Sequence, residues 1–186
     1  GISPNYQGNW EDEENQSANI PPEKNCSFWI TGLPLDTSYK KLLRHIRGYG
    51  RIYNSHINSP EWHDGMFTKA AKLTFVDLPA ASRFYSDYTL KKLVLQDEPY
   101  LKATIVRNRI RVAEHALPPN HSRVLIITGS VSEVHPEILL EKFKRLFIYD
   151  VDSTFVSPVD ENDHVTVEVR LGRYPCQADP AYTSMI

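Results

Sequence analysis

The sequence has little cysteine and no long hydrophobic run. Only two of its 186 residues are cysteines, Cys26 and Cys176, too few for a disulfide framework or a cysteine-based metal site. No stretch approaches the roughly 18 consecutive apolar residues of a membrane-spanning helix, and the first residues lack the basic-then-apolar pattern of a secretion signal. These absences favour the reducing interior of a cell, in the nucleus or cytoplasm, and predict no membrane partner.

The sequence motifs of catalysis are also missing. The seven histidines are scattered, and no H-E-x-x-H, C-x-x-C or G-x-S-x-G pattern occurs. Nothing in the sequence indicates that either cysteine is an activated nucleophile. We therefore expect a protein that is not an enzyme and that needs neither a metal nor a cofactor.

The net charge of −2 conceals an uneven distribution. Residues 1–24 carry five acidic side chains and one basic one, and residues 115–186 carry ten acidic and six basic ones. Residues 25–114 are the reverse, with fourteen Lys or Arg and eight Asp or Glu. Only this middle block has the sign of charge that a phosphate backbone attracts.

The stretch 28–33 predicts the strand around which the chain is organised. Phe28 and Ile30 alternate with Trp29 and Thr31, so the two pairs face opposite sides of a sheet. Gly32-Leu33-Pro34 ends the strand, because proline has no N–H for a ladder. If Phe28 and Ile30 face the core, Trp29 lies on the open side, where a large aromatic favours a stacking partner. The alternative is that a linker or the N-terminal arm covers it.

The patterns that follow predict the order β-α-β-β-α-β. The predicted elements are a helix from Tyr39 to Ile46, strands at 51–57 and 69–76, a helix starting near Pro79, and a hairpin of Leu101–Val106 with Arg109–Ala113. This order is the ferredoxin-like split βαβ arrangement, in which two helices cover one face of a four-stranded antiparallel sheet. The other face is left open, and Lys72, Thr74, Arg109 and Arg111 are expected on it.

The pattern restarts after Pro118-Pro119, which indicates an internal repeat. Residues 124–129 parallel the opening strand, with Gly129 matching Gly32 and Ile126 matching Trp29. A helix from His135, two strands and the start of a second helix near Cys176 follow, without a fourth strand. The predicted fold is α+β, two tandem ferredoxin-like copies, the second incomplete at its C-terminus.

These patterns divide the chain into four parts. They are an acidic arm (1–24), a first domain (25–114), a linker (115–121) and a second, degenerate or truncated domain (122–186). The composition of the arm favours a flexible tail. The alternative is an acidic flap, in which Tyr6 and Trp10 stack on the basic sheet and Glu11–Glu14 pair with its arginines.

The hexamer Phe28-Trp29-Ile30-Thr31-Gly32-Leu33 resembles the first-strand signature of the RNA recognition motif (RRM) family. That signature reads aliphatic, aromatic, aliphatic, any residue, Asn or Gly, then Leu, and Trp29 takes its stacking place. The third-strand signature is matched only in part, because Ala70 and Lys72 stand where the family has aromatics. The pair of motifs is similar to tandem RRM proteins of filamentous fungi, with a degenerate second copy.

The resemblance implies that the open face of the first domain binds single-stranded RNA through stacking, phosphate contacts and hydrogen bonds to base edges. The residues expected to bind are Trp29, Thr31, Tyr53, Lys72, Thr74, Arg109 and Arg111. Tyr53 belongs to this set only if no bulge in its strand changes the side that it faces. The alternative is a protein–protein interaction scaffold. The second domain, with Thr166, Glu168 and Arg170 on its open face, is expected to hold a protein partner or the neighbouring domain rather than RNA.

Overall fold

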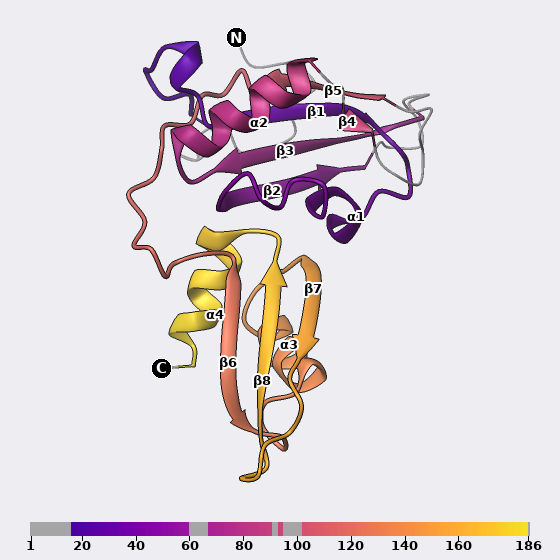
Figure 1. Ribbon diagram of the computed structural model, residues 1–186, viewed down its shortest axis with the longest axis vertical. Helices are drawn as coiled ribbons and strands as arrows, with labels where there is room; N and C mark the ends of the chain where they lie inside the picture. The colour runs from indigo at the N-terminus through magenta and orange to yellow at the C-terminus, as the bar shows by residue number, and fades with distance from the viewer. Residues whose placement is uncertain (1–15, 60–66, 91–92, 95–101, 186) are drawn as a thin grey trace.

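The computed structural model describes residues 16–59, 67–90, 93–94 and 102–185. These residues form two domains, each with its own hydrophobic core, joined by an extended linker (Figure 1). None of the helices in the described ranges is long and apolar enough to cross a membrane.

The first domain contains a mixed set of strands and helices in the predicted order. Its elements are β1 (Ser27–Leu33), α1 (Tyr39–Leu43), β2 (Ile52–Asn58), β3 (Lys69–Phe75), α2 (Leu78–Leu90), β4 (Leu93–Val94) and β5 (Lys102–Arg107). The sheet order is β2-β3-β1-β5-β4, with each neighbouring pair antiparallel. Without the two-residue β4, this is the predicted split βαβ sheet.

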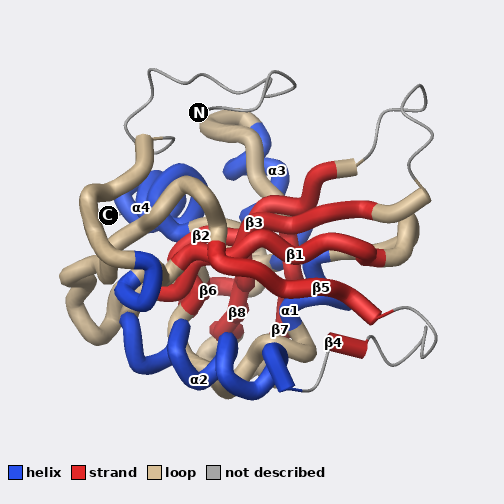
Figure 2. Tube along the Cα trace, turned by 90° about the horizontal axis from the view of Figure 1, so that it is seen from above, coloured by secondary structure: helices blue, strands red, loops and turns tan. Residues whose placement is uncertain are grey.

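One face of this sheet carries the core. Phe28 and Ile30 of β1 are fully buried together with Leu42 of α1 and Phe84 of α2, so both helices pack on the same face. The Phe28 ring lies 5.3 Å from that of Phe84 and 5.6 Å from that of Tyr85, centroid to centroid. Figure 2 shows α2 running along one side of the sheet. None of the helices in the part of the chain that the structure describes packs on the opposite face, which carries Trp29.

Local polar contacts fix both helices of the first domain. The Ser38 hydroxyl accepts a hydrogen bond from the Lys41 N–H at the start of α1, and the Asp77 carboxylate accepts one from the Ala80 N–H at the start of α2, at 2.8 Å; both are N-caps. Gly50 has φ +148°, and a Cβ there would lie 2.5 Å from the Cβ of Ala80. Only glycine lets the chain enter β2 so close to α2.

The predicted hairpin is half correct. Its first arm is β5, which pairs with β1, but residues 109–113 form no strand and the predicted second arm is wrong. The buried Asn25 side chain holds this segment instead. Its Oδ1 accepts from the N–H groups of Ser27 and Val112, at 2.9 and 3.0 Å, and its Nδ2 donates to the Asn108 carbonyl at 2.8 Å. These bonds turn the chain across the end of β1 rather than along its edge.

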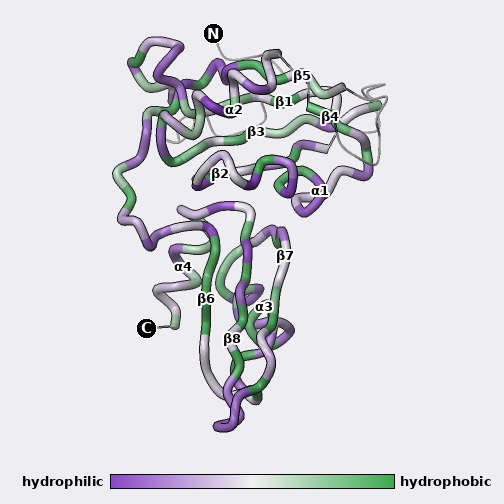
Figure 3. The backbone as a smooth tube through the Cα atoms, in the orientation of Figure 1, coloured by the Kyte–Doolittle hydropathy of each residue, from purple (hydrophilic) through white to green (hydrophobic). Residues whose placement is uncertain are grey.

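The second domain repeats this arrangement up to its second helix, without a fourth strand among the residues that the structure describes. Its elements are β6 (Val124–Ser130), α3 (Pro136–Lys144), β7 (Val151–Val156), β8 (His164–Leu171), a π-helical turn η3 (Tyr174–Ala178) and α4 (Asp179–Thr183). The sheet order is β6-β8-β7. Val165, Val167, Val169 and Leu171 of β8 alternate into the core. Figure 3 shows hydrophobic residues along β6 and a hydrophilic tip at the β7–β8 turn.

The two domains meet at the outer edge of β2. The Gly172 carbonyl, just after β8, accepts from both the N–H and the hydroxyl of Ser55, at 3.1 and 2.7 Å. The carboxylate of Asp152, only 3% exposed, binds Arg47 of the first domain at 2.5 Å and Arg123 of the second at 3.1 Å. Backbone pairing and an ion triad centred on a buried carboxylate therefore connect the two domains.

Replacing Asn25 with alanine is expected to destabilise the first domain by about 1–3 kcal/mol, because two buried N–H groups and one carbonyl lose their partner. Urea unfolding followed by circular dichroism measures the change. Asn120→Ala, in the exposed linker, is the matched control and should shift the midpoint little. A loss below about 0.5 kcal/mol for Asn25→Ala would show that the segment after β5 is held by other contacts.

Candidate nucleic-acid interface

Trp29 lies on the helix-free face of the first sheet. In the strand register it stands opposite Lys72 of β3 on one side and Val106 of β5 on the other. Trp29 is half-buried, and Val106 is 47% exposed. Thr31 follows on the same face, opposite Thr104 of β5. An indole flanked by an ammonium and an exposed apolar side chain is suited to stacking a planar group.

Tyr53 lies at a bulge in β2. The register between β2 and β3 shifts between Ile52 and Asn54, so β2 contains the kind of bulge that can change the side a residue such as Tyr53 faces. Its ring stacks on that of His115 in the linker, with centroids 3.6 Å apart and planes inclined by 14°. One face of the tyrosine is therefore occupied by the protein itself.

A cavity of about 490 Å³ adjoins this stacked pair. Residues of the sheet, of the segment after β5 and of the chain before β1 line it. They are Gln16, Ser17, Ala18, Tyr53, Asn54, Lys72, Thr74, Arg111, Val112, Ala113 and His115. Four of the predicted site residues, Tyr53, Lys72, Thr74 and Arg111, thus share one hollow, whereas Trp29, Thr31 and Arg109 are not among its lining residues.

Two of the predicted site residues in this cavity are held by other parts of the chain. Thr74 is 1% exposed and its hydroxyl donates to that of Ser27 at 3.2 Å. The Arg111 guanidinium donates to the Ile20 carbonyl at 2.6 Å, and the backbone N–H of Arg111 donates to the Ser17 hydroxyl. Arg109 lies on the same segment and is exposed. The segment before β1 therefore lies against Arg111, while Tyr6, Trp10 and Glu11–Glu14 of the hypothetical flap fall outside the described residues.

Two polar atoms in the cavity wall have no hydrogen-bond partner in the part of the chain that the structure describes. They are Oδ1 of Asn54, a residue only 9% exposed, and Nε2 of His115. Burial lowers the pKa of His115, so its ring is neutral at pH 7. An unpaired buried acceptor is costly, and a ligand with N–H donors would satisfy it. Neither residue could be found from sequence patterns, because neither belongs to a recognisable motif.

His56 of β2 stands opposite Lys72 and marks the border between the open face and the second domain. Its Nδ1 contacts the Arg173 guanidinium, which also lies 3.6 Å from the Asp150 carboxylate. The pKa of His56 is lowered, first by burial and then by Arg173 and Lys72, against the opposing effects of Asp150 and Asn58. The neutral imidazole is therefore the form that fits this junction.

The strand order places the first domain in the ferredoxin-like α+β class, and the helices of the described residues pack on one face of its sheet. This is the sheet arrangement that RNA recognition motifs use. No protein-family model and no curated protein matches the sequence.

Among solved structures, similarity is found to RRM domains 1 and 2 of Sex-lethal from Drosophila melanogaster (15% identity, TM-score 0.34, covering 87% of this chain and 94% of that one). The first two RRM domains of the yeast poly(U)-binding protein Pub1 are similar at 15% identity and TM-score 0.37, covering 86% and 89% of the two chains. The RNA-binding domain of Hrp1 in complex with RNA is similar at 15% identity and TM-score 0.33, covering 87% and 88%. These scores are low, and the fold assignment rests on the strand order alone.

Acidification is expected to weaken the junction through His56. Its folded-state pKa lies below the ordinary value of 6.5, so the folded protein binds this proton less tightly than the unfolded chain. The contribution of neutral His56 to the free energy of unfolding is therefore fully present above pH 6.5, and it is lost as the pH falls below that value. His56→Gln should therefore lose less stability than the parent protein between pH 7.5 and pH 5.5 in urea unfolding. The exposed His164→Gln is the control, and equal losses in all three proteins would contradict the role of His56.

Proposed function

We propose that this protein binds single-stranded RNA, without catalysing a reaction on it, through the open face of its first sheet. The observation that carries the proposal is the position of Trp29 on the helix-free face, between Lys72 and the exposed Val106. The excess of basic residues in positions 25–114 supports it, because a positive surface attracts the phosphate backbone.

In this mechanism a splayed base stacks on the Trp29 indole, a contact worth about 1–3 kcal/mol. Lys72, opposite Trp29 in the register, supplies positive charge near the phosphate that follows the stacked base. Thr31, on the same face, is a hydrogen-bonding group for a base edge or a ribose hydroxyl. The exposed Arg109 adds charge along the path of the strand.

The cavity beside Tyr53 supplies a second contact in the same proposal. Asn54 Oδ1 is a hydrogen-bond acceptor without a partner in the described ranges, and the exocyclic amino group of adenine, cytosine or guanine is a donor that suits it. Lys72 belongs both to this cavity and to the surroundings of Trp29. Neighbouring nucleotides would therefore occupy adjacent positions on one face.

Modest, salt-dependent affinity is expected from this surface. Ala70 and Lys72 stand where RRM proteins carry aromatics on the third strand, so Trp29 is the main stacking platform of the first sheet. Fewer stacked bases give less sequence preference, and the remaining binding free energy comes mostly from charge.

Trp29→Leu is expected to weaken binding of pooled fluorescent oligonucleotides by about 5- to 100-fold in anisotropy titrations, because the stacking surface is lost. The unfolding midpoint should change little, since the side chain is only half-buried. Tyr182→Leu, which removes a 51% exposed aromatic from α4, is the control. Unchanged affinity in Trp29→Leu would exclude the stacking role.

A protein-interaction scaffold is the second candidate function. On the open face of the second sheet, Ile126 is 71% exposed and stands opposite Glu168, which in turn pairs with the 51% exposed Phe155. Exposed apolar neighbours of this kind are suited to a protein partner. Salt separates the two functions, because RNA binding falls steeply between low and moderate salt whereas an apolar contact does not.

The hypothesis of an acidic flap has its own test. Deleting residues 1–15, which removes Tyr6, Trp10 and Glu11–Glu14 but keeps the Ser17 and Ile20 contacts to Arg111, should raise RNA affinity if the arm competes for the basic face. The measurement is the same anisotropy titration, at two salt concentrations. Equal RNA affinity of the shortened and full chains would exclude the flap and leave the flexible-tail interpretation.

A further inference from the structure

Four arginines surround a pocket of about 380 Å³ between the two domains. Arg47 and Arg51 come from the turn between α1 and β2 in the first domain, whereas Arg123 and Arg170 come from the start of β6 and from β8 in the second. This hollow is formed by other residues than the cavity beside Tyr53, and it exists only because the two domains are docked.

The acidic groups at this pocket are too few to neutralise the arginines. Asp152 is shared by Arg47 and Arg123, and Glu168 pairs with Arg170. Arg51 bonds only to backbone carbonyls among the described residues, at 2.7 Å to Pro118 and 2.9 Å to His121. Four guanidinium groups against two carboxylates leave two positive charges in excess.

The arginines are close enough to repel one another. The pKa of Arg123 is lowered, mainly by burial but also by the charges of Arg47 and Arg170, against the attraction of Asp152. An arginine keeps its proton under such conditions, so the unfavourable charge remains in the pocket. A bound anion would offset it, and guanidinium groups are well shaped for the oxygens of a phosphate.

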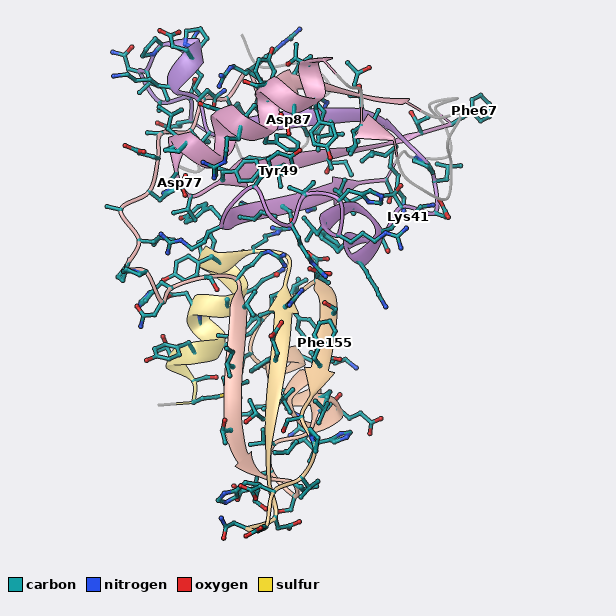
Figure 4. The ribbon with its side chains drawn as sticks, in the orientation of Figure 1. Lys41, Tyr49, Phe67, Asp77, Asp87 and Phe155 are labelled. Atoms are coloured by element: carbon teal, nitrogen blue, oxygen red, sulfur yellow. The ribbon has the colours of Figure 1, made fainter. Side chains whose placement is uncertain are left out.

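Phe155 of β7 extends this site across the open face of the second sheet. Its side chain is 51% exposed, and the Arg170 guanidinium lies 4.8 Å from its ring centroid. Figure 4 labels Phe155 on the second domain. Arg170 therefore belongs both to the pocket and to a cation–π pair. The guanidinium lies over the ring, and the part of the ring that stays exposed is a stacking surface for a base beside the pocket that Arg170 lines.

We propose that the interdomain pocket binds a backbone phosphate of the RNA strand and that Phe155, with Arg170, stacks the adjoining base. The proposal rests on the RNA binding proposed above and gives the second domain a direct part in it. Because the pocket needs both domains, a strand bound there also holds them in their docked arrangement.

The test compares Arg51→Gln, Phe155→Leu and Trp29→Leu in the full chain. Arg145→Gln is the charge-matched control. Arg145 lies at the end of α3 in the second domain, and its side chain is 78% exposed. Anisotropy titrations with pooled single-stranded RNA are run at several salt concentrations. Phe155→Leu should weaken binding at least fivefold. Arg51→Gln should make the slope of log affinity against log salt shallower by about 0.7, the value for one lost phosphate contact on a single strand.

Each variant is first checked for an unchanged circular dichroism spectrum and urea midpoint, and Arg170→Gln, at another arginine of the pocket, replaces Arg51→Gln if the latter disturbs the linker. If Trp29→Leu weakens binding while Arg51→Gln and Phe155→Leu behave like Arg145→Gln, the interdomain site is excluded and the open face of the first sheet stands. If the parent protein binds no RNA, both proposals fall.

A separate experiment adds inorganic phosphate without RNA and measures the thermal unfolding midpoint. Arg51-dependent stabilisation by phosphate, with RNA affinity unchanged in both variants, would mean that the pocket takes a free phosphate and would overturn its role in RNA binding.

Discussion

The buried carboxylate of Asp152 is the interaction on which the two-domain structure depends. It is almost removed from water and receives one guanidinium from each domain. A buried charge of this kind is tolerable only while its partners stay in place, so the carboxylate favours one docking geometry over others. The contacts of Gly172 with Ser55 and the pocket between the domains depend on that geometry.

The fold of the first domain was largely predictable from local patterns. Alternation at Phe28 and Trp29 predicted which side of β1 faces the helices, and the predicted helix starts at Tyr39 and near Pro79 agree with α1 and α2. The wrong element was the second arm of the hairpin at 109–113. Its alternating residues suit a strand, but the buried Asn25 amide, 84 residues before Arg109 in the chain, binds the backbone there. A long-range side-chain clamp leaves no periodic signal.

The candidate site was predictable to a smaller extent. Residues on regular strands, such as Trp29 and Lys72, could be assigned a face from their position in the alternation. The contributions of His115, Asn54 and the arginines around the interdomain pocket could not, because they follow from a β-bulge, a linker path and the docking of two domains. Those features are tertiary, and no short window of sequence encodes them.

The contact between Gly172 and Ser55 has a consequence for the behaviour of the chain at high concentration. β2 is an outer strand of the first sheet, and an outer strand with unpaired backbone groups is a template for another molecule. The second domain lies against this strand through Gly172 and Arg173. Docking thus protects the protein against edge-to-edge polymerisation, and a chain whose domains have separated would be the species prone to aggregate.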